Sequence, residues 1–235
     1  MLKISILIIV FSFVFFGATN AQEVKPPNAE VKKPAPKIEK KVNQRPTVEA
    51  SKTAEPFEKA TVDAMALQCV KFETEAGTIE LEMFPESAPE SVRSFLNLAA
   101  SGAFDTTVFS RVVPGFIIQG GDLFTRLTKM TAELDKRARR TLPDEPSQIK
   151  HERGILSMAR GDEPNTATTD FFILLSQASY LDGKFAAFGR VTKGMETVEA
   201  INKMPVENEK PAKPVRINRA TVAPCVVPAK SPQQI

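Results

Sequence analysis

Apolar residues follow two different periods along the chain after residue 68. Alternation of apolar and polar positions over 69–74 and 77–83 predicts two strands with one buried face, joined by a turn at 75–77. From Pro89 the apolar positions change to helical spacing, and Gly102 fits a C-terminal cap. Later runs rich in β-branched and aromatic residues predict further strands at 107–113, 116–119, 154–159, 171–175, 186–191 and 215–222, with a second helix at about 195–203.

This succession predicts a mainly β fold. Many short strands and two widely separated helices are typical of a closed or nearly closed β-barrel with helices capping its ends. The charged stretch Lys129–Arg140 predicts a short surface helix, and we interpret its charges as a solvated face.

The first residues have the pattern of an export signal. Lys3 precedes an apolar run over 4–16, and small residues at 19–21 form a plausible cleavage point, so we expect residues 1–21 to be a signal peptide. The alternative is an uncleaved membrane anchor, although the run is shorter than the ~20 residues that a membrane span needs. Cleavage predicts an exported protein that is not inserted in a membrane, with the periplasm as the expected location and the extracellular space as the alternative.

A tract rich in proline, lysine and glutamate follows over residues 22–62. It contains six prolines and almost no large apolar residues. Such a tract cannot bury enough surface to offset its ordering entropy, so we expect a disordered linker. The folded domain is then expected over residues 63–226, followed by a flexible tail over residues 227–235.

The positive charge lies outside the expected domain. The whole chain has a formal net charge of +3, but residues 22–60 alone carry +3 and residues 61–226 carry −2. A nucleic-acid-binding domain concentrates positive charge on itself, so the sequence argues against a nucleic-acid partner. Nothing in the sequence demands more than a monomer.

Two cysteines, Cys69 and Cys225, lie near the two ends of the expected domain. In an oxidising compartment such a pair is a disulfide candidate, provided that the first and last strands are antiparallel neighbours. The alternative is two unpaired thiols buried near the strand ends.

Several kinds of active-site chemistry are missing. His151 is the one histidine, so a Ser-His-Asp or Cys-His arrangement has to use it. The sequence contains no GxSxG motif, no GxxxxGK[ST] motif and no cluster with zinc-ligand spacing. We therefore expect neither covalent nor metal-dependent catalysis, and no metal or cofactor.

Three segments in a fixed order carry a specific pattern instead. They are FSRVVPGFIIQGGD (109–122); GILSMAR (154–160) with PNT (164–166) and DFFI (170–173); and YLDGKF (180–185) with AFGRV (187–191). Together they resemble the cyclophilin family of peptidyl-prolyl cis-trans isomerases, of the bacterial exported type. The resemblance covers about residues 69–223 and is weakest over 124–150. It implies an eight-stranded antiparallel closed barrel capped by two helices.

The resemblance also implies a catalytic group. Arg111 matches the catalytic arginine, and Gln119 matches the glutamine that orients the substrate backbone. Phe116 stands with them in the catalytic set. The pocket for the proline ring matches Phe116 together with Ile117, Phe172 and Leu181.

The remaining positions of the implied site include three departures from the family pattern. Ala159 and Arg160 match positions whose backbone contacts the bound peptide. Tyr180 stands where many eukaryotic members have the tryptophan linked to cyclosporin binding, so high affinity for cyclosporin is not expected. Phe185 stands where many members have histidine, and its flat apolar ring implies little loss of activity. Asp170 stands where glutamine is usual, and we expect its charge near the peptide, where it could pair with Arg111 or Arg160.

The resemblance implies an enzyme that accelerates isomerisation of X-Pro bonds in proline-containing polypeptides and needs no cofactor. The expected role is assistance to the folding of exported proteins. The alternative is a peptide-binding or chaperone module of the same fold with little catalysis.

Overall fold

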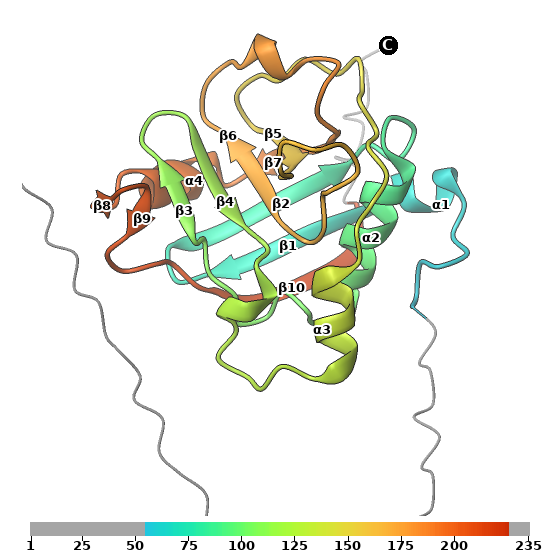
Figure 1. The fold of residues 1–235 in the computed structure, drawn as a ribbon, viewed down its shortest axis with the longest axis horizontal. Coiled ribbons are helices and arrows are strands. Elements are labelled where there is room, and N and C mark those ends of the chain that lie inside the picture. Colours follow the sequence, from blue (N-terminus) through green and yellow to red (C-terminus); the bar gives the residue numbers. More distant parts are fainter. Residues whose placement is uncertain (1–54, 226–235) are drawn as a thin grey trace, which may run out of the picture. The chain divides into compact units, whose positions relative to one another are not determined.

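A computed structural model describes residues 55–225 of the chain (Figure 1). Its main sheet has the strand order β10-β1-β2-β7-β5-β6-β4-β3, and every neighbouring pair is antiparallel. The strands are β1 (Gln68–Thr74), β2 (Gly77–Met83), β3 (Arg111–Val113), β4 (Ile117–Gly120), β5 (Ile155–Met158), β6 (Phe171–Leu174), β7 (Ala187–Lys193) and β10 (Ile217–Pro224), with a separate hairpin of β8 (Val206–Glu207) and β9 (Lys210–Pro211). The helices are α1 (Val62–Ala66), α2 (Pro89–Ala100), α3 (Ala132–Arg139) and α4 (Met195–Asn202), and two 3₁₀ turns lie at Leu123–Thr125 and Ser179–Leu181.

The predicted mainly β architecture is confirmed, but closure of the barrel is only partial. The edge strands β3 and β10 are not paired with each other as strands. The sheet curls until the segment before β3 meets the segment before β10, where Val108 and Arg216 form an isolated bridge. The N–H of Phe109 also donates to the carbonyl of Val215 at 2.9 Å. The run 107–113, predicted as one strand, therefore divides into this bridge and the short strand β3.

Aromatic side chains fill the inside of the curved sheet. The largest fully buried side chains are those of Phe72, Phe95, Phe104, Phe109, Phe171 and Phe188. Their rings contact each other at centroid separations such as 5.0 Å for Phe95–Phe188 and 5.7 Å for Phe72–Phe171, as expected for packed aromatic pairs. Phe109, Phe171 and Phe188, which lie in the three recognisable segments, are thus core residues and not part of the site.

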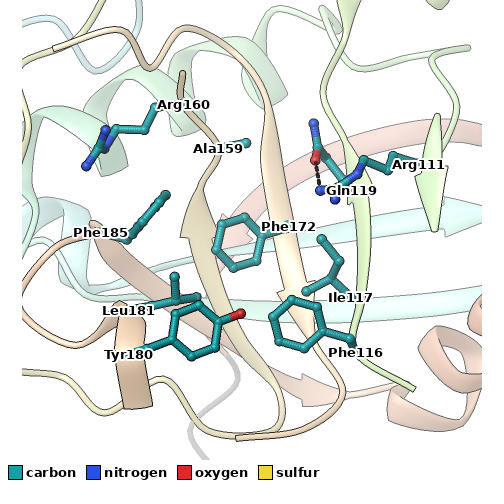
Figure 2. A pocket seen from close by; sticks show the side chains of 10 residues that line it. All are labelled: Arg111, Phe116, Ile117, Gln119, Ala159, Arg160, Phe172, Tyr180, Leu181 and Phe185. Carbon is teal, nitrogen blue, oxygen red and sulfur yellow. Dashed lines mark hydrogen bonds between the residues drawn. The ribbon is translucent and has the colours of Figure 1, made fainter. Parts of the chain in front are cut away.

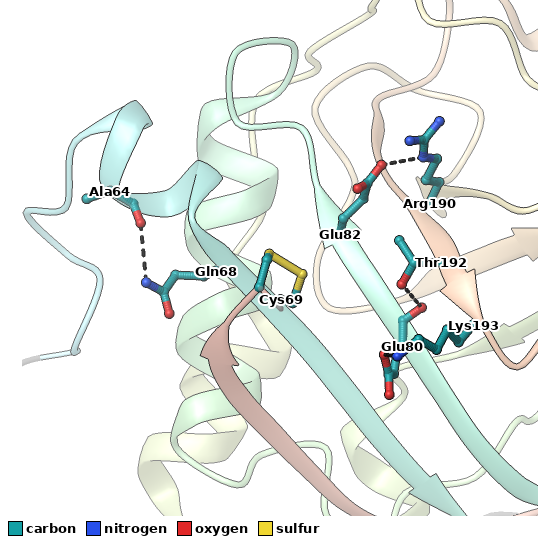
Figure 3. Close-up of a disulfide and its surroundings, with 9 residues drawn as sticks. Ala64, Gln68, Cys69, Glu80, Glu82, Arg190, Thr192 and Lys193 are labelled. Carbon is teal, nitrogen blue, oxygen red and sulfur yellow. Dashed lines mark hydrogen bonds and ion pairs between the residues drawn. A yellow bond between two sulfur atoms is a disulfide. The ribbon is translucent and has the colours of Figure 1, made fainter. Parts of the chain in front are cut away.

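The polar positions of β2 and β7 lie on the outside of the sheet. Figure 3 shows Glu80 and Glu82 of β2 beside Lys193 and Arg190 of β7, and both pairs form ion pairs. In β2 this outer polar row and the buried inner row are the two halves of the alternation that predicted the strand.

Strands β4 and β6 are covered on both faces. Ile118 of β4 and Ile173 of β6 belong to the main core, whereas Ile117 and Phe172 belong to a second cluster on the outer face. Leu181, from a 3₁₀ turn that lies over this face, completes that cluster. Because β6 is buried on both sides, its sequence is a continuous run of apolar residues. Its outer face is therefore an apolar surface next to the site.

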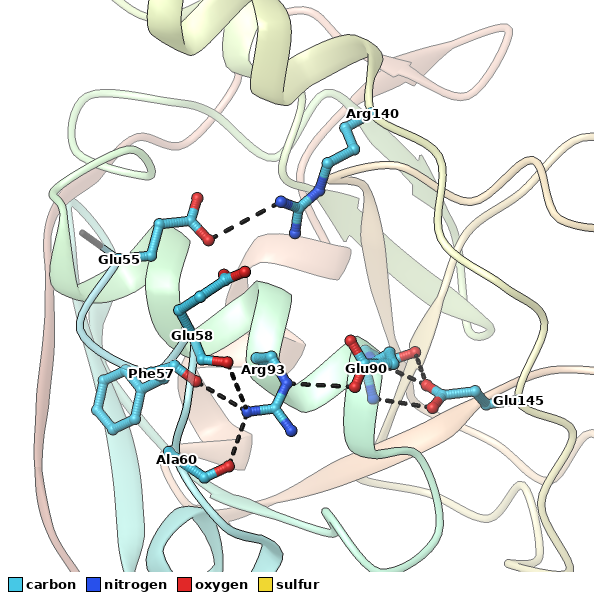
Figure 4. Close-up of polar contacts among 9 residues, drawn as sticks. Glu55, Phe57, Glu58, Ala60, Glu90, Arg93, Arg140 and Glu145 are labelled. Carbon is cyan, nitrogen blue, oxygen red and sulfur yellow. Dashed lines mark hydrogen bonds and ion pairs between the residues drawn. The ribbon is translucent and has the colours of Figure 1, made fainter. Parts of the chain in front are cut away.

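Helix α2 begins at Pro89, which suits a first helical position because its missing N–H needs no partner there. Ala88 at the N-cap has no side-chain acceptor. The carboxylate of Glu145 supplies one instead, accepting from the backbone N–H groups of Glu90 and Ser91, each at 2.8 Å (Figure 4). A residue more than fifty positions away thus caps the helix and places a negative charge at its N-terminus.

Residues 55–62, predicted as the end of a disordered linker, are packed on the domain. Arg93 of α2 donates to the backbone carbonyls of Phe57 at 2.9 Å and Ala60 at 2.7 Å (Figure 4). The N–H of Phe57 donates to the side chain of Asn97 at 2.8 Å. The predicted boundary at residue 62 was therefore wrong for this stretch, because composition does not reveal that α2 carries donors and acceptors for its backbone. The rest of the predicted linker, the signal peptide and the tail lie outside the described residues.

Helix α3 confirms the helix predicted within Lys129–Arg140, but its face is not fully solvated. Arg137 is buried and forms an ion pair with Glu55 at 2.9 Å. Burial lowers the pKa of Arg137 below its ordinary value, and the nearby charge of Arg140 adds to this effect. One arginine of the charged stretch therefore anchors the segment that precedes α1.

Cys69 at the start of β1 and Cys225 just after β10 form a disulfide (Figure 3). Their strands are antiparallel neighbours, and Cys69 is in register with Ala223. The pairing brings the two Cα atoms to 4.8 Å, within the range that a disulfide requires.

Within residues 55–225, no helix has the length and apolar character needed to cross a membrane.

Candidate active site

A pocket opens on the outer face of β3, β4 and β6 (Figure 2). Its volume is about 230 Å³. It is lined by Arg111, Phe116, Ile117, Gln119, Ala159, Arg160, Phe172, Tyr180, Leu181 and Phe185. The structure thus brings together ten of the eleven site residues predicted from the sequence, drawn from three separate segments.

Arg111 and Gln119 form the polar side of the pocket. They face each other across the β3–β4 pair, where Arg111 is in register with Gln119. The Nη1 of Arg111 donates to the Oε1 of Gln119 at 3.3 Å, as Figure 2 shows. The antiparallel register therefore converts a sequence separation of eight residues into a direct contact.

The apolar side of the pocket consists of Ile117, Phe172 and Leu181, all of them buried. Phe172 is only 5% exposed and is in register with Gln119, so the apolar floor begins beside the polar pair. Phe116 continues the wall, and its ring stacks on that of Tyr180 with centroids 6.4 Å apart. Tyr180 itself is 63% exposed and forms the outer lip.

Arg160 and Phe185 lie on the side opposite Arg111 (Figure 2). The guanidinium of Arg160 lies over the ring of Phe185, 4.7 Å from its centroid, which is a cation–π geometry. Phe185 in turn contacts Phe172 edge to face at 6.3 Å. Arg160 also forms an ion pair with Asp144 at 3.7 Å, so a residue of the 124–150 region contacts this wall.

The family model described as "Cyclophilin type peptidyl-prolyl cis-trans isomerase/CLD" matches residues 69–222, which is more than half of the chain. The chain belongs to the family of cyclophilin-type peptidyl-prolyl cis-trans isomerases. The recognition drawn from the three sequence segments is confirmed at the level of the family.

Individual cyclophilin relatives support this assignment. The chain is 40% identical over 141 residues to peptidyl-prolyl cis-trans isomerase CYP23 of Arabidopsis thaliana, covering 60% of this chain and 62% of that protein. It is 35% identical over 163 residues to peptidyl-prolyl cis-trans isomerase A of Dickeya dadantii, covering 63% of this chain and 81% of the relative. The chain thus spans less than two thirds of the Arabidopsis relative and most of the Dickeya one.

A solved structure shares the fold. A cyclophilin-type isomerase of Cryptosporidium parvum, crystallised in the presence of the dipeptide Ala-Pro, is 32% identical with a TM-score of 0.58. The similarity covers 66% of this chain and 98% of the other.

Asp170 is the one predicted site residue that does not line the cyclophilin pocket. It lies just before β6 and pairs with neither Arg111 nor Arg160, contrary to expectation. The groups that act on its carboxyl are Asp122 and Gln119 instead. Burial raises the pKa of Asp170 to about 6, with the charge of Asp122 adding to the rise and the Gln119 hydrogen bond opposing it.

The single histidine does lie between a serine and an aspartate. The Nε2 of His151 is 3.2 Å from the Oγ of Ser157, and its Nδ1 is 3.1 Å from Asp182. This line of residues is not a hydrolytic site, because His151 and Ser157 are completely buried and the Oγ of Ser157 donates to the carbonyl of Ala186 at 2.9 Å. Burial lowers the pKa of His151, which favours the neutral ring. Ser157 is the register partner of Phe172 across β5 and β6. The buried His151–Ser157 contact therefore lies next to the strand position that carries the pocket residue Phe172.

One contact of the site was missed by the sequence analysis. The Nε of Arg111 donates to the carboxylate of Glu209 at 2.7 Å, across 98 positions of sequence. Glu209 lies in the turn between β8 and β9, far from the three recognisable segments. The place of Glu209 in a hairpin loop is known only from the structure, because β8 and β9 were not predicted from the sequence. Among residues 55–225, no group of three His, Cys, Asp or Glu side chains could hold a metal ion.

Proposed function

We propose that this cyclophilin accelerates cis–trans isomerisation of X-Pro bonds in polypeptides that fold after export, with Arg111 as the catalytic group. One observation carries the proposal: the Arg111–Gln119 pair lies at the edge of a pocket whose other walls are aromatic and aliphatic. This arrangement matches the two needs of the reaction, a binding place for an apolar ring and a hydrogen-bond donor for its nitrogen.

The chemistry needs no nucleophile. The barrier to rotation is about 18–20 kcal/mol because the C–N bond has partial double-bond character. A donor that hydrogen-bonds the prolyl nitrogen favours its pyramidal form, in which the lone pair is withdrawn from resonance with the carbonyl. Each ~1.4 kcal/mol removed from the barrier gives a tenfold gain in rate.

Arg111 is equipped for this task. A guanidinium carries five N–H donors and stays charged at any working pH. Two of the five are used within residues 55–225, one on Glu209 and one on Gln119. Three N–H groups therefore remain for the substrate, on a guanidinium whose orientation is already fixed on two sides.

The other residues hold the peptide. The buried surfaces of Ile117, Phe172 and Leu181, with Phe116 beside them, accept the proline ring and exclude water around it. Gln119 presents its amide next to Arg111 and orients the substrate backbone. The Ala159 N–H already donates to the carbonyl of Asp170 at 2.9 Å, so contact between this residue and a peptide would use its carbonyl.

A protease-coupled assay on an Ala-Pro-Phe tetrapeptide tests the proposal. We expect Arg111→Ala to lower kcat/KM by about a hundredfold or more, as for loss of a donor aimed at the transition state. Arg219→Ala is the matched control, because Arg219 is exposed on β10 and does not line the pocket. If the parent chain isomerises the peptide no faster than Arg111→Ala, the alternative of a peptide-binding module with little catalysis replaces the enzyme.

The export role rests on residues 1–21, which lie outside the described residues. The support for it is the basic start, the apolar run and the small residues at 19–21. A disulfide between Cys69 and Cys225 also fits an oxidising compartment such as the periplasm. Mass spectrometry of the mature protein tests this part: a first residue near Gln22 supports export with cleavage, and an intact Met1 in protein recovered from the cell envelope supports the anchored alternative.

A further inference from the structure

The turn between β8 and β9 presents the carboxylate of Glu209 to Arg111, and its backbone has a conformation that is strained for residues other than glycine. β8 and β9 pair with Glu207 opposite Lys210, so Asn208 and Glu209 form a two-residue loop. Both have positive φ, 49° and 64°. Two-residue hairpins with two positive φ angles are the type I′ kind, which strongly favours asparagine followed by glycine. Here the glycine position holds a glutamate.

A side chain at positive φ is strained, and such strain in a native structure points to a use for that side chain. For Glu209 the contact is visible: its Oε2 accepts from the Nε of Arg111 at 2.7 Å. Both side chains are nearly half exposed, 48% and 44%, so the pair adds little to stability in water. Stabilisation of the fold therefore does not account for a glutamate in the strained position.

The hairpin is held firmly against the strand that carries Arg111. The N–H of Val112 donates to the carbonyl of Glu209 at 2.8 Å, so the backbone of the turn is attached directly to β3. Behind it, Asn202 at the end of α4 donates to the carbonyls of Val113 and Ile117, each at 2.9 Å. Figure 1 shows α4, β8, β9 and β3 gathered at one side of the molecule. The carboxylate thus comes from a fixed position and not from a freely moving loop.

We propose that Glu209 is a positioning residue for catalysis: it binds the Nε edge of Arg111 and so directs the Nη groups toward Gln119 and the prolyl nitrogen. This inference rests on the proposed function. Glu209 does not itself line the pocket, so it acts through Arg111. Without it, the long arginine side chain regains rotamers in which its donors point to solvent, and ordering them again in the transition state lowers the rate.

Two variants and one matched control test the inference in the coupled assay. We expect Glu209→Gln to lower kcat about three- to tenfold while KM changes less than twofold, because binding of the ring depends on the apolar wall. Glu209→Gly should lose the same activity while its thermal midpoint equals or exceeds that of the parent, because glycine relieves the strained φ. Glu207→Gln removes the same charge from an exposed position of the same hairpin and should retain parent activity.

A double-variant cycle separates positioning from a general charge effect. In the Arg111→Ala background, Glu209→Gln should produce no further loss, since a residue acting through Arg111 has nothing left to position. Parent-like or higher kcat for Glu209→Gln, an equal loss for Glu207→Gln, or a loss that persists without Arg111 would each overturn the inference. These results differ from failure of the proposed function, in which Arg111→Ala itself leaves the rate unchanged.

Discussion

The partly buried carboxyl of Asp170 predicts a pH-dependent gain of stability on substitution by asparagine. Its pKa is raised from the ordinary 3.8 to about 6, first by burial and then by the charge of Asp122. A carboxyl whose pKa is higher in the folded state binds its proton more tightly there than in the unfolded chain. Its contribution to stability is therefore complete below about pH 4 and is lost as the pH rises through 6.

The size of the effect follows from this pKa. A rise of about 2 pH units corresponds to about 3 kcal/mol in the free energy of unfolding at pH 8. Relaxation around the charged group reduces this figure, so we expect Asp170→Asn to gain about 1–3 kcal/mol. For a domain of this size, the gain raises the thermal midpoint by about 3–10 °C. Asparagine keeps one oxygen that can accept from the Gln119 amide, so this hydrogen bond need not be lost.

Thermal or urea unfolding of the parent and Asp170→Asn, measured between pH 4 and pH 8, checks the prediction. The two proteins should unfold at nearly the same midpoint at pH 4 and diverge up to about pH 6.5, above which the difference is constant. Asp122→Asn provides the control, because it removes the second cause of the raised pKa while its oxygen can still accept from the N–H of Phe124. In that background the gain from Asp170→Asn should be smaller. A gain independent of pH, or a variant less stable than the parent at pH 8, would refute the reasoning.

Two further predictions concern contacts outside the pocket. Glu145→Ala removes the acceptor for two N–H groups at the start of α2, so denaturant unfolding should show a loss of about 1–2 kcal/mol, while the matched exposed change Glu163→Ala leaves stability unchanged. Replacing both Cys69 and Cys225 by serine releases a loop of 156 residues in the unfolded chain, so stability should fall by about 3–5 kcal/mol. Because neither cysteine lines the pocket, kcat/KM of the folded double variant at 25 °C should stay within twofold of the parent, and a larger loss would show that the disulfide also supports the site.

The sequence by itself predicted the strands of the main sheet and the main helices, and its resemblance to a known family named most of the pocket. Alternation and apolar runs are local patterns, so β1, β2 and β6 could be predicted without knowledge of their neighbours. The recognisable segments also named most of the pocket residues, through their resemblance to the cyclophilin family. Arg111 and Gln119 were named in this way, but the β3–β4 register that brings them to 3.3 Å was found only in the structure.

Only the tertiary structure decided the contacts that join distant parts of the chain. The carboxylate of Glu209 reaches Arg111, that of Glu145 caps α2, and Arg93 holds the backbone of residues 55–60. The expected pairing of Asp170 with Arg111 or Arg160 was wrong for the same reason, because the side chains near its carboxyl, Asp122 and Gln119, are set by tertiary packing. A buried polar group needs a hydrogen-bond partner, but many different groups can serve as that partner. A hydrogen bond between two surface elements therefore produces no periodic pattern of residues in either element. The recognisable segments of the sequence therefore identified the residues of the pocket. The packing around the pocket determined how Arg111 is held.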